Sequence, residues 1–221
     1  MFADIRWDAL QEYFPLFLKG ILMTAEITVI SVAIGVVLGL FAGMGRISHN
    51  PIVRLIPNIY VGFFRGTPLF VQILLIHFAV LPAIFGKSPA AMVSGIVALS
   101  LNAGAYIAEI FRAGIQSIDR GQMEAARSLG LSYSQSMFHI ILPQAVRRML
   151  PPLGNEAIML LKDSSLLAAI SLPEVTYYAK LMAGKTYLAW EPYLTIALMY
   201  LVLTLLLARL VKFLERKYGT V

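Results

Sequence analysis

Long hydrophobic runs separated by short polar stretches extend along the whole chain. A helix that crosses a bilayer needs about 20 mostly apolar residues, and five windows meet or approach that length. They cover residues 16–45, 51–85, 89–112, 144–172 and 192–209. The pattern predicts an all-α integral membrane protein with five transmembrane helices, folded as a single domain over residues 1–221.

Small residues and helix breakers in the first two windows predict how these helices pack. Gly35, Gly39 and Gly43 recur every four residues on one helix face, which permits close approach of another helix. We expect this face to pack within the chain rather than against a second copy. Residues 66–68, Gly-Thr-Pro, predict a break. Either a surface helix precedes a span that starts near residue 66, or one long kinked helix carries Arg65 inward.

The first fifteen residues differ from the windows that follow. They contain three acidic residues and several aromatic ones, and they lack the basic start and small-residue cleavage site of a signal peptide. Aromatic side chains of this kind favour the membrane interface. We expect residues 1–15 to form an amphipathic segment at the membrane surface.

Composition supports a membrane protein and excludes several other classes. Hydrophobic residues make up 59% of the chain, against about 45–50% in soluble domains. Cysteine is absent, so no disulfide or cysteine-ligated metal is expected, and nothing indicates a cofactor. The net charge of +6 comes from basic residues spread among loops, without the clustered basic face typical of nucleic-acid binding. We expect no nucleic-acid partner.

The distribution of lysine and arginine predicts the orientation in the membrane. Basic residues concentrate in cytoplasmic loops. With the N-terminus outside and residues 112–143 inside, twelve of the 18 basic residues fall on the cytoplasmic side. This orientation also places the C-terminus in the cytoplasm.

The polar stretch at residues 112–143 carries specific helix signals. Ser117 or Asp119 can cap a helix N-terminus, and Gly130 suits the left-handed position that ends a helix. Ser132 and Gln135 have the spacing of a capping box that starts the next helix. The stretch therefore predicts two short helices that meet at a compact elbow.

The same stretch resembles a known family. Glu124, Ala125 and Ala126, followed by Gly130, Ile140 and Leu142-Pro143, are similar to the EAA loop of permease subunits of bacterial ABC importers. The segments FFRGTPLFVQ and KDSSL resemble those of permeases for polar amino acids, the histidine/glutamine permease family. The resemblance extends from the second window through the fourth.

This resemblance implies a fold, a location and a set of partners. The fold would be that of type I ABC importer permeases, in the bacterial plasma (inner) membrane. Residues 112–143 would form a cytoplasmic coupling region, in which Glu124, Ala125, Ala126 and Gly130 contact the ATPase. The expected partners are two ATP-binding cassette subunits, a second identical or related permease copy and an extracytoplasmic amino-acid-binding protein.

Residues 179–186, AKLMAGKT, fit a relaxed phosphate-loop pattern. Such a loop must follow a buried strand and open a helix, whereas this stretch is expected in an outer loop of an all-helical chain. We predict that the chain has no ATPase of its own and is not an enzyme.

Two acids in the fourth window are the best candidates for substrate binding. Inserting a carboxylate at the centre of a membrane helix costs about 2.5–3.5 kcal/mol, so such residues usually face a bundle interior or a water-filled path. Glu156 and Asp163 are two helical turns apart and lie on nearly the same face. A cationic substrate would neutralise both.

Other assignments of the polar residues remain open. Glu156 or Asp163 can instead pair with Lys162, with Arg65 or with an arginine at 147–148 for structure alone. Asn102 and Thr67 are further substrate-binding candidates, as hydrogen-bond partners of the α-amino or α-carboxylate group. Glu109 lies nearer the cytoplasm and is better explained as an ion-pair partner of Arg112 or Arg65.

Together these features predict ATP-driven import of polar amino acids. An acid at position 156 resembles permeases for basic amino acids, which favours arginine, lysine or histidine, whereas glutamine or another polar amino acid is the alternative substrate. The rival function is an ion-gradient-driven transporter or channel that uses Glu156 and Asp163 as a cation relay.

Overall fold

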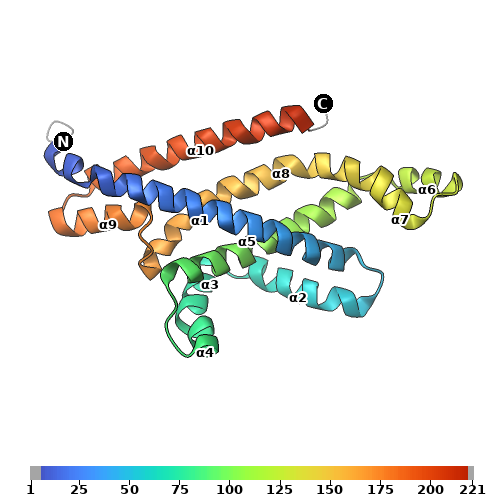
Figure 1. The fold of residues 1–221 in the computed structure, drawn as a ribbon, viewed down its shortest axis with the longest axis horizontal. Coiled ribbons are helices and arrows are strands. Elements are labelled where there is room, and N and C mark those ends of the chain that lie inside the picture. Colours follow the sequence, from blue (N-terminus) through green and yellow to red (C-terminus); the bar gives the residue numbers. More distant parts are fainter. Residues whose placement is uncertain (1–5, 219–221) are drawn as a thin grey trace.

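The computed structural model describes residues 6–218, and helices account for nearly all of that range (Figure 1). No strand occurs among the described residues. The elements are α1 (Trp7–Ile47), α2 (Pro51–Gly66), α3 (Leu69–Leu75), the π-helix η1 (Ile76–Val80), α4 (Leu81–Phe85), α5 (Ala91–Gln116), α6 (Arg120–Ser128), α7 (Tyr133–Ser136), the π-helix η2 (Met137–Ile141), α8 (Leu142–Asp163), the 3₁₀-helix η3 (Ser164–Ile170), α9 (Val175–Thr186) and α10 (Trp190–Tyr218).

Helices α1 and α5 form the central pair of the molecule. Gly35, Gly39 and Gly43 of α1 lie against α5, so closely that a Cβ atom added at Gly39 would lie 2.5 Å from Cγ2 of Ile107 and 3.0 Å from the carbonyl oxygen of Gly104. The glycine face therefore packs within the chain, as predicted, and brings the two helix backbones together.

The predicted break at residues 66–68 is confirmed. Helix α2 ends at Gly66, Thr67 and Pro68 have extended backbones, and the helical segment that follows turns away by 108°. The bend is much sharper than a kink within one long helix. It leaves α2 beside α1 and α5 and points α3, η1 and α4 to the side (Figure 1).

Three helices, α1, α5 and α10, are long and apolar enough to cross a membrane, and the bent segment at residues 51–85 makes a fourth if it counts as one span. Helix α8 fails the same criterion because it carries five ionisable side chains. It nevertheless runs beside α5 and α10. Five spans with an outside N-terminus therefore remain a prediction.

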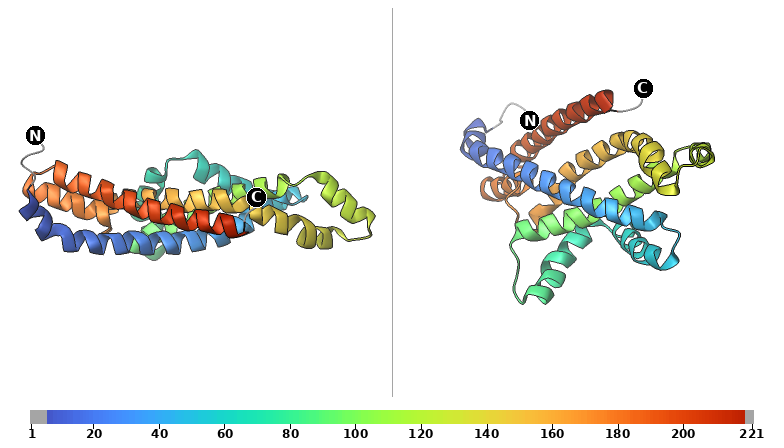
Figure 2. Two further views of the ribbon diagram at one scale, coloured as in Figure 1. Left: turned by 90° about the horizontal axis from the view of Figure 1, so that it is seen from above. Right: turned by 45° about the vertical axis from the view of Figure 1, so that its right-hand side comes forward.

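The elbow helices α6 and α7 project beyond the other helices at one end of the molecule, whereas α9 and the start of α1 lie at the opposite end (Figure 2). Helix α5 leads the chain to the elbow, and α8 leads it back. The expected coupling region at residues 112–143 thus forms one end of the structure.

Helix α1 begins at Trp7 and continues through Pro15 without interruption. The stretch expected to form a separate surface segment is thus, from Trp7 onward, the start of a 41-residue helix. Residues 1–5 lie outside the described range. At 1.5 Å per residue α1 is about 60 Å long, well beyond the hydrocarbon thickness of about 30 Å.

Residues 179–186 lie within helix α9. No strand precedes them in the described part of the chain, so they cannot form a phosphate loop. The structure thus supports the rejection of this motif.

Candidate functional site

The elbow has the local geometry that the sequence predicts. Asp119 caps α6 by accepting a hydrogen bond from the amide of Gly121 at 2.7 Å, whereas the hydroxyl of Ser117 donates to a carbonyl in α5. Gly130 has a left-handed backbone with φ of +88°. Ser132 and Gln135 form the complete capping box at the start of α7.

The residues predicted to contact an ATPase are unequally exposed. Glu124 and Ala125 are exposed, whereas Ala126 is buried against the rest of this chain. Leu129, just before the turn, is 84% exposed. The elbow therefore exposes charges of both signs, Glu124 and Arg127, beside the apolar side chain of Leu129. Its role in coupling remains a prediction.

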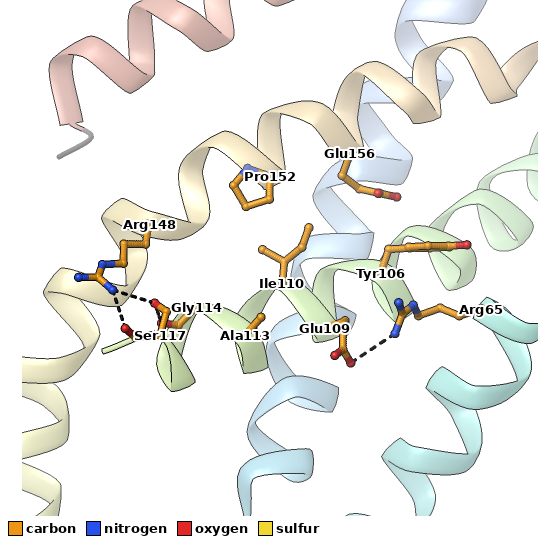
Figure 3. A pocket seen from close by; sticks show the side chains of 10 residues that line it. All are labelled: Arg65, Tyr106, Glu109, Ile110, Ala113, Gly114, Ser117, Arg148, Pro152 and Glu156. Carbon is orange, nitrogen blue, oxygen red and sulfur yellow. Dashed lines mark hydrogen bonds and ion pairs between the residues drawn. The ribbon is translucent and has the colours of Figure 1, made fainter. Parts of the chain in front are cut away.

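A cavity of about 510 Å³ lies mainly between α5 and α8, with Arg65 of α2 at its edge (Figure 3). This volume falls in the range of small-molecule sites, about 300–1,000 Å³. Arg148 and Ser117 lie at the end of the cavity nearer the elbow, and Glu156 and Tyr106 lie at the other end. The complete lining is Arg65, Tyr106, Glu109, Ile110, Ala113, Gly114, Ser117, Arg148, Pro152 and Glu156.

Glu156 is the candidate acid that lines this cavity. Its residue is only 8% exposed, and no described cation lies within 4 Å of its carboxylate. Buried charges are normally paired. The structure therefore shows none of the structural ion pairs that offered an alternative explanation of this residue.

Asp163 ends α8 two turns beyond Glu156. It is partly buried, lies outside the cavity lining and likewise has no cation within 4 Å among the described residues. Two carboxylates thus follow one another along α8 without a partner. Their proposed sharing of one substrate remains a prediction.

Asn102 and Thr67 belong to a hydrogen-bond network around the break between α2 and α3. The amide nitrogen of Gln72 donates to the hydroxyl and carbonyl oxygens of Thr67 and to the carbonyl of Phe64. Asn102 donates to the side-chain oxygen of Gln72 at 2.9 Å. In this conformation, therefore, Asn102 and Thr67 stabilise the break between α2 and α3 and do not line the cavity.

Gln72 is the polar residue of this network that the sequence analysis did not identify. It is 2% exposed within an apolar helix, and a buried amide requires hydrogen-bond partners. An isolated glutamine in a membrane segment next to a predicted break was the signal available in the sequence.

Glu109 is the centre of an ion-pair cluster, as predicted. Arg112 and Arg46 both donate hydrogen bonds to it, and a guanidinium nitrogen of Arg65 lies 3.4 Å away. Arg46, which also donates to Asn58, was not predicted to take part. The cluster joins α1, α2 and α5 beside the cavity.

Comparisons with known proteins bear on this arrangement. A family model described as "Binding-protein-dependent transport system inner membrane component" matches residues 35–220. A Bacillus subtilis (strain 168) protein named "Probable amino-acid ABC transporter permease protein YckA" is 39% identical over 99% of both chains. An Escherichia coli (strain K12) protein named "Glutamine transport system permease protein GlnP" is 37% identical over 96% of both chains.

A solved structure described as "Crystal structure of an amino acid ABC transporter with histidines" has the same fold, with a TM-score of 0.90 and 41% identity. The match covers 97% of this chain and 99% of the solved one. The likeness therefore includes the elbow, the broken helix and the helices that enclose the cavity.

Proposed function

The chain belongs to the family of binding-protein-dependent transport system inner membrane components, and we propose that, as an amino-acid permease of that family, it imports basic amino acids. As an amino-acid ABC transporter permease it is a multi-pass protein of the bacterial plasma membrane, with the all-helical fold of type I importers. Permeases of this family work with ATPase subunits, which hydrolyse the ATP, and with a binding protein.

The assembly that we propose contains two permease copies and two ATPase subunits. An extracytoplasmic binding protein would deliver the amino acid to it. Glu124, Ala125, Ala126 and Gly130 would transmit closure of the ATPases to the spans. The position of the elbow at one end of the molecule supports this role. The motion would be a rigid-body transition between two packed arrangements.

The buried carboxylate of Glu156 is the observation that supports a basic substrate. It faces the cavity, and no cationic side chain of the described residues lies within 4 Å of it. A cationic ligand group would form a charge-assisted hydrogen bond with it, which is stronger than a neutral one. Asp163, farther along α8, would add a second negative charge for a long cationic side chain.

Glutamine is the second candidate substrate. The Escherichia coli relative is named a glutamine permease, whereas the structural relative was solved with histidines. For glutamine, Glu156 would bind the α-ammonium group, which every amino acid carries. A basic amino acid would thus place its side-chain cation at Glu156, whereas glutamine would place its α-ammonium group there.

Ligand profiles of a Glu156→Gln variant test the proposal. The complex of permease and ATPase, purified without binding protein, would be titrated by calorimetry with arginine, lysine, histidine and glutamine. We expect the variant to lose roughly tenfold or more in affinity for the basic amino acids, since a charge-assisted hydrogen bond is replaced by a neutral one. Glutamine binding should fall less.

Lys162→Gln is the control, since it changes an exposed charge on the same helix that does not line the cavity. An unchanged ligand profile in Glu156→Gln would reject the basic substrate class. Equal losses for all four amino acids would instead indicate recognition of the α-ammonium group.

A further inference from the structure

Arg65 and Glu156 place opposite charges at the same end of the cavity. Figure 3 shows both side chains beside Tyr106, away from Arg148 and Ser117. Arg65 comes from the last turn of α2 and Glu156 from α8. A free amino acid also carries opposite charges, on its α-carboxylate and its α-ammonium group.

The guanidinium of Arg65 is only partly neutralised. Its nearest counter-ion is Glu109, at 3.4 Å and without a hydrogen bond, and this carboxylate already accepts hydrogen bonds from Arg46 and Arg112. Three guanidinium groups thus share one carboxylate. The Arg65 side chain is also the most exposed of the three, at 40% against 18% for Arg46 and 31% for Arg112.

Arg65 is nonetheless held in place. Its guanidinium lies over the ring of Tyr106, 5.3 Å from the ring centroid, a distance at which cation and ring attract each other. Arginine presents two parallel N–H groups that match a carboxylate. A guanidinium that is oriented, accessible and incompletely paired is suited to bind a carboxylate ligand.

No other residue of the cavity lining is a cation that is both incompletely paired and close to Glu156. Arg148 lies at the opposite end and donates to the carbonyl oxygen of Ser117 at 2.5 Å. Asn102 and Thr67 lie outside the lining, and their polar atoms bond to Gln72 and to backbone carbonyls. In this conformation, Arg65 is the cation available to a ligand that reaches Glu156.

We propose that Arg65 binds the α-carboxylate of the transported amino acid, while Glu156 holds a cationic group of the same molecule. The ligand carboxylate would replace Glu109 as the main counter-ion of Arg65, and Glu109 would stay paired with Arg46 and Arg112. This inference rests on the proposed function and adds the α-carboxylate as a second group by which the permease recognises its substrate. The permease itself would select α-amino acids over amines and amides that lack the carboxylate.

The test compares each amino acid with its carboxamide. Arginine and argininamide, and glutamine and glutaminamide, would be titrated by calorimetry into the permease–ATPase complex without binding protein, so that only the permease selects. We expect the parent complex to bind the amino acid roughly tenfold to a hundredfold more tightly than the amide. Arg65→Gln should remove that preference and leave amide binding nearly unchanged.

Two further variants separate ligand binding from structure. Arg65→Lys retains a positive charge and should recover part of the preference, because an ammonium binds a carboxylate without the paired geometry. Arg54→Gln changes an exposed arginine of the same helix that does not line the cavity and should leave the preference intact. Melting temperatures of all variants would report any loss of folding.

Three results would overturn the role of Arg65. The first is an unchanged amino-acid preference in Arg65→Gln, and the second is an equal loss of affinity for the amino acid and its amide, which indicates a structural residue. A parent complex that binds the amino acid and its amide equally would also overturn it. If the parent binds no amino acid at all, the proposed function itself fails, so the two failures are distinguishable.

Discussion

The polar contacts of single residues in this fold are of two kinds, those with neighbours in the sequence and those with residues far along the chain. The helix cap at Asp119 and the left-handed Gly130 follow from chemistry within a few residues. The bonds from Arg46 to Glu109 and from Asn102 to Gln72 join residues 63 and 30 positions apart. Only the packing of α1, α2, α3 and α5 brings these groups together.

Gly39 and Gly62 test how closely α1 and α5 are packed. At Gly39 an added methyl group would meet the side chain of Ile107 at 2.5 Å and the carbonyl of Gly104 at 3.0 Å, and a carbonyl fixed in a helix cannot move aside. Overpacking of this kind costs about 1–3 kcal/mol, more than the ~1 kcal/mol that alanine gains over glycine in a helix. We expect Gly39→Ala to lower the melting temperature of the purified complex.

Gly62 is the matched control, because no atom lies within 4 Å of a Cβ atom added there. Gly62→Ala should be neutral or slightly stabilising, as expected for alanine in a helix. If both variants melt at the temperature of the parent, the close contact between α1 and α5 is not present in the folded protein.

At the scale of elements, apolar windows located the long helices, and the fourth window, residues 144–172, overlaps α8 even though the polar content of this helix excludes it under a strict hydropathy criterion. Its five ionisable residues include Glu156, the residue on which the proposed function depends. A functional span departs from the apolar pattern at the positions that face a path or partner. Segments 66–68 and 128–132 were predictable because glycine, proline and capping residues act locally.

The turn between α6 and α7 provides a test of coupling through backbone conformation. Gly130 has φ of +88° and open space around it, so alanine would not clash but would strain the backbone by about 1–2 kcal/mol. Gly130→Ala should therefore shift the elbow, and uptake of amino acid per ATP hydrolysed should fall in proteoliposomes. Gly130→Asn is the control, since asparagine tolerates this conformation. If the two variants transport equally well, the turn does not transmit the motion.

The exposed acid of α6 tests the docking surface. Glu124 is exposed, and no described residue bonds to its carboxylate, so Glu124→Ala should leave folding of the permease intact. We expect weaker association with the ATPase, seen as loss of that subunit during gel filtration of the complex. Gln122→Ala, on the same helix and also exposed, should retain it. Full association in Glu124→Ala would contradict the docking role of this residue.

At the scale of the whole molecule, the cavity extends from Ser117 and Arg148, nearer the elbow, to Glu156. Its walls come from α5 and α8, whose separation no local sequence pattern specifies. The sequence therefore identified the acid on one wall but not the space in front of it. If α5 and α8 move with the elbow, we expect the end of the cavity that contains Ser117 and Arg148 to open and close during transport. Glu156, at the other end of the cavity, would move together with α8.

A single cysteine in this cavity measures that movement directly, since the chain has none of its own. Ala113 lines the cavity midway along its α5 wall, and Ala113→Cys should react with a membrane-impermeant maleimide in inside-out vesicles. Trapping the ATPases with vanadate should slow the reaction several-fold, because rocking of the spans closes the elbow side. Lys87→Cys, exposed between α4 and α5, should react only in right-side-out vesicles. Reaction of both cysteines from the same side of the membrane would reject the predicted orientation. If vanadate does not change the rate at which Ala113→Cys reacts with the maleimide, the elbow and the cavity are not coupled.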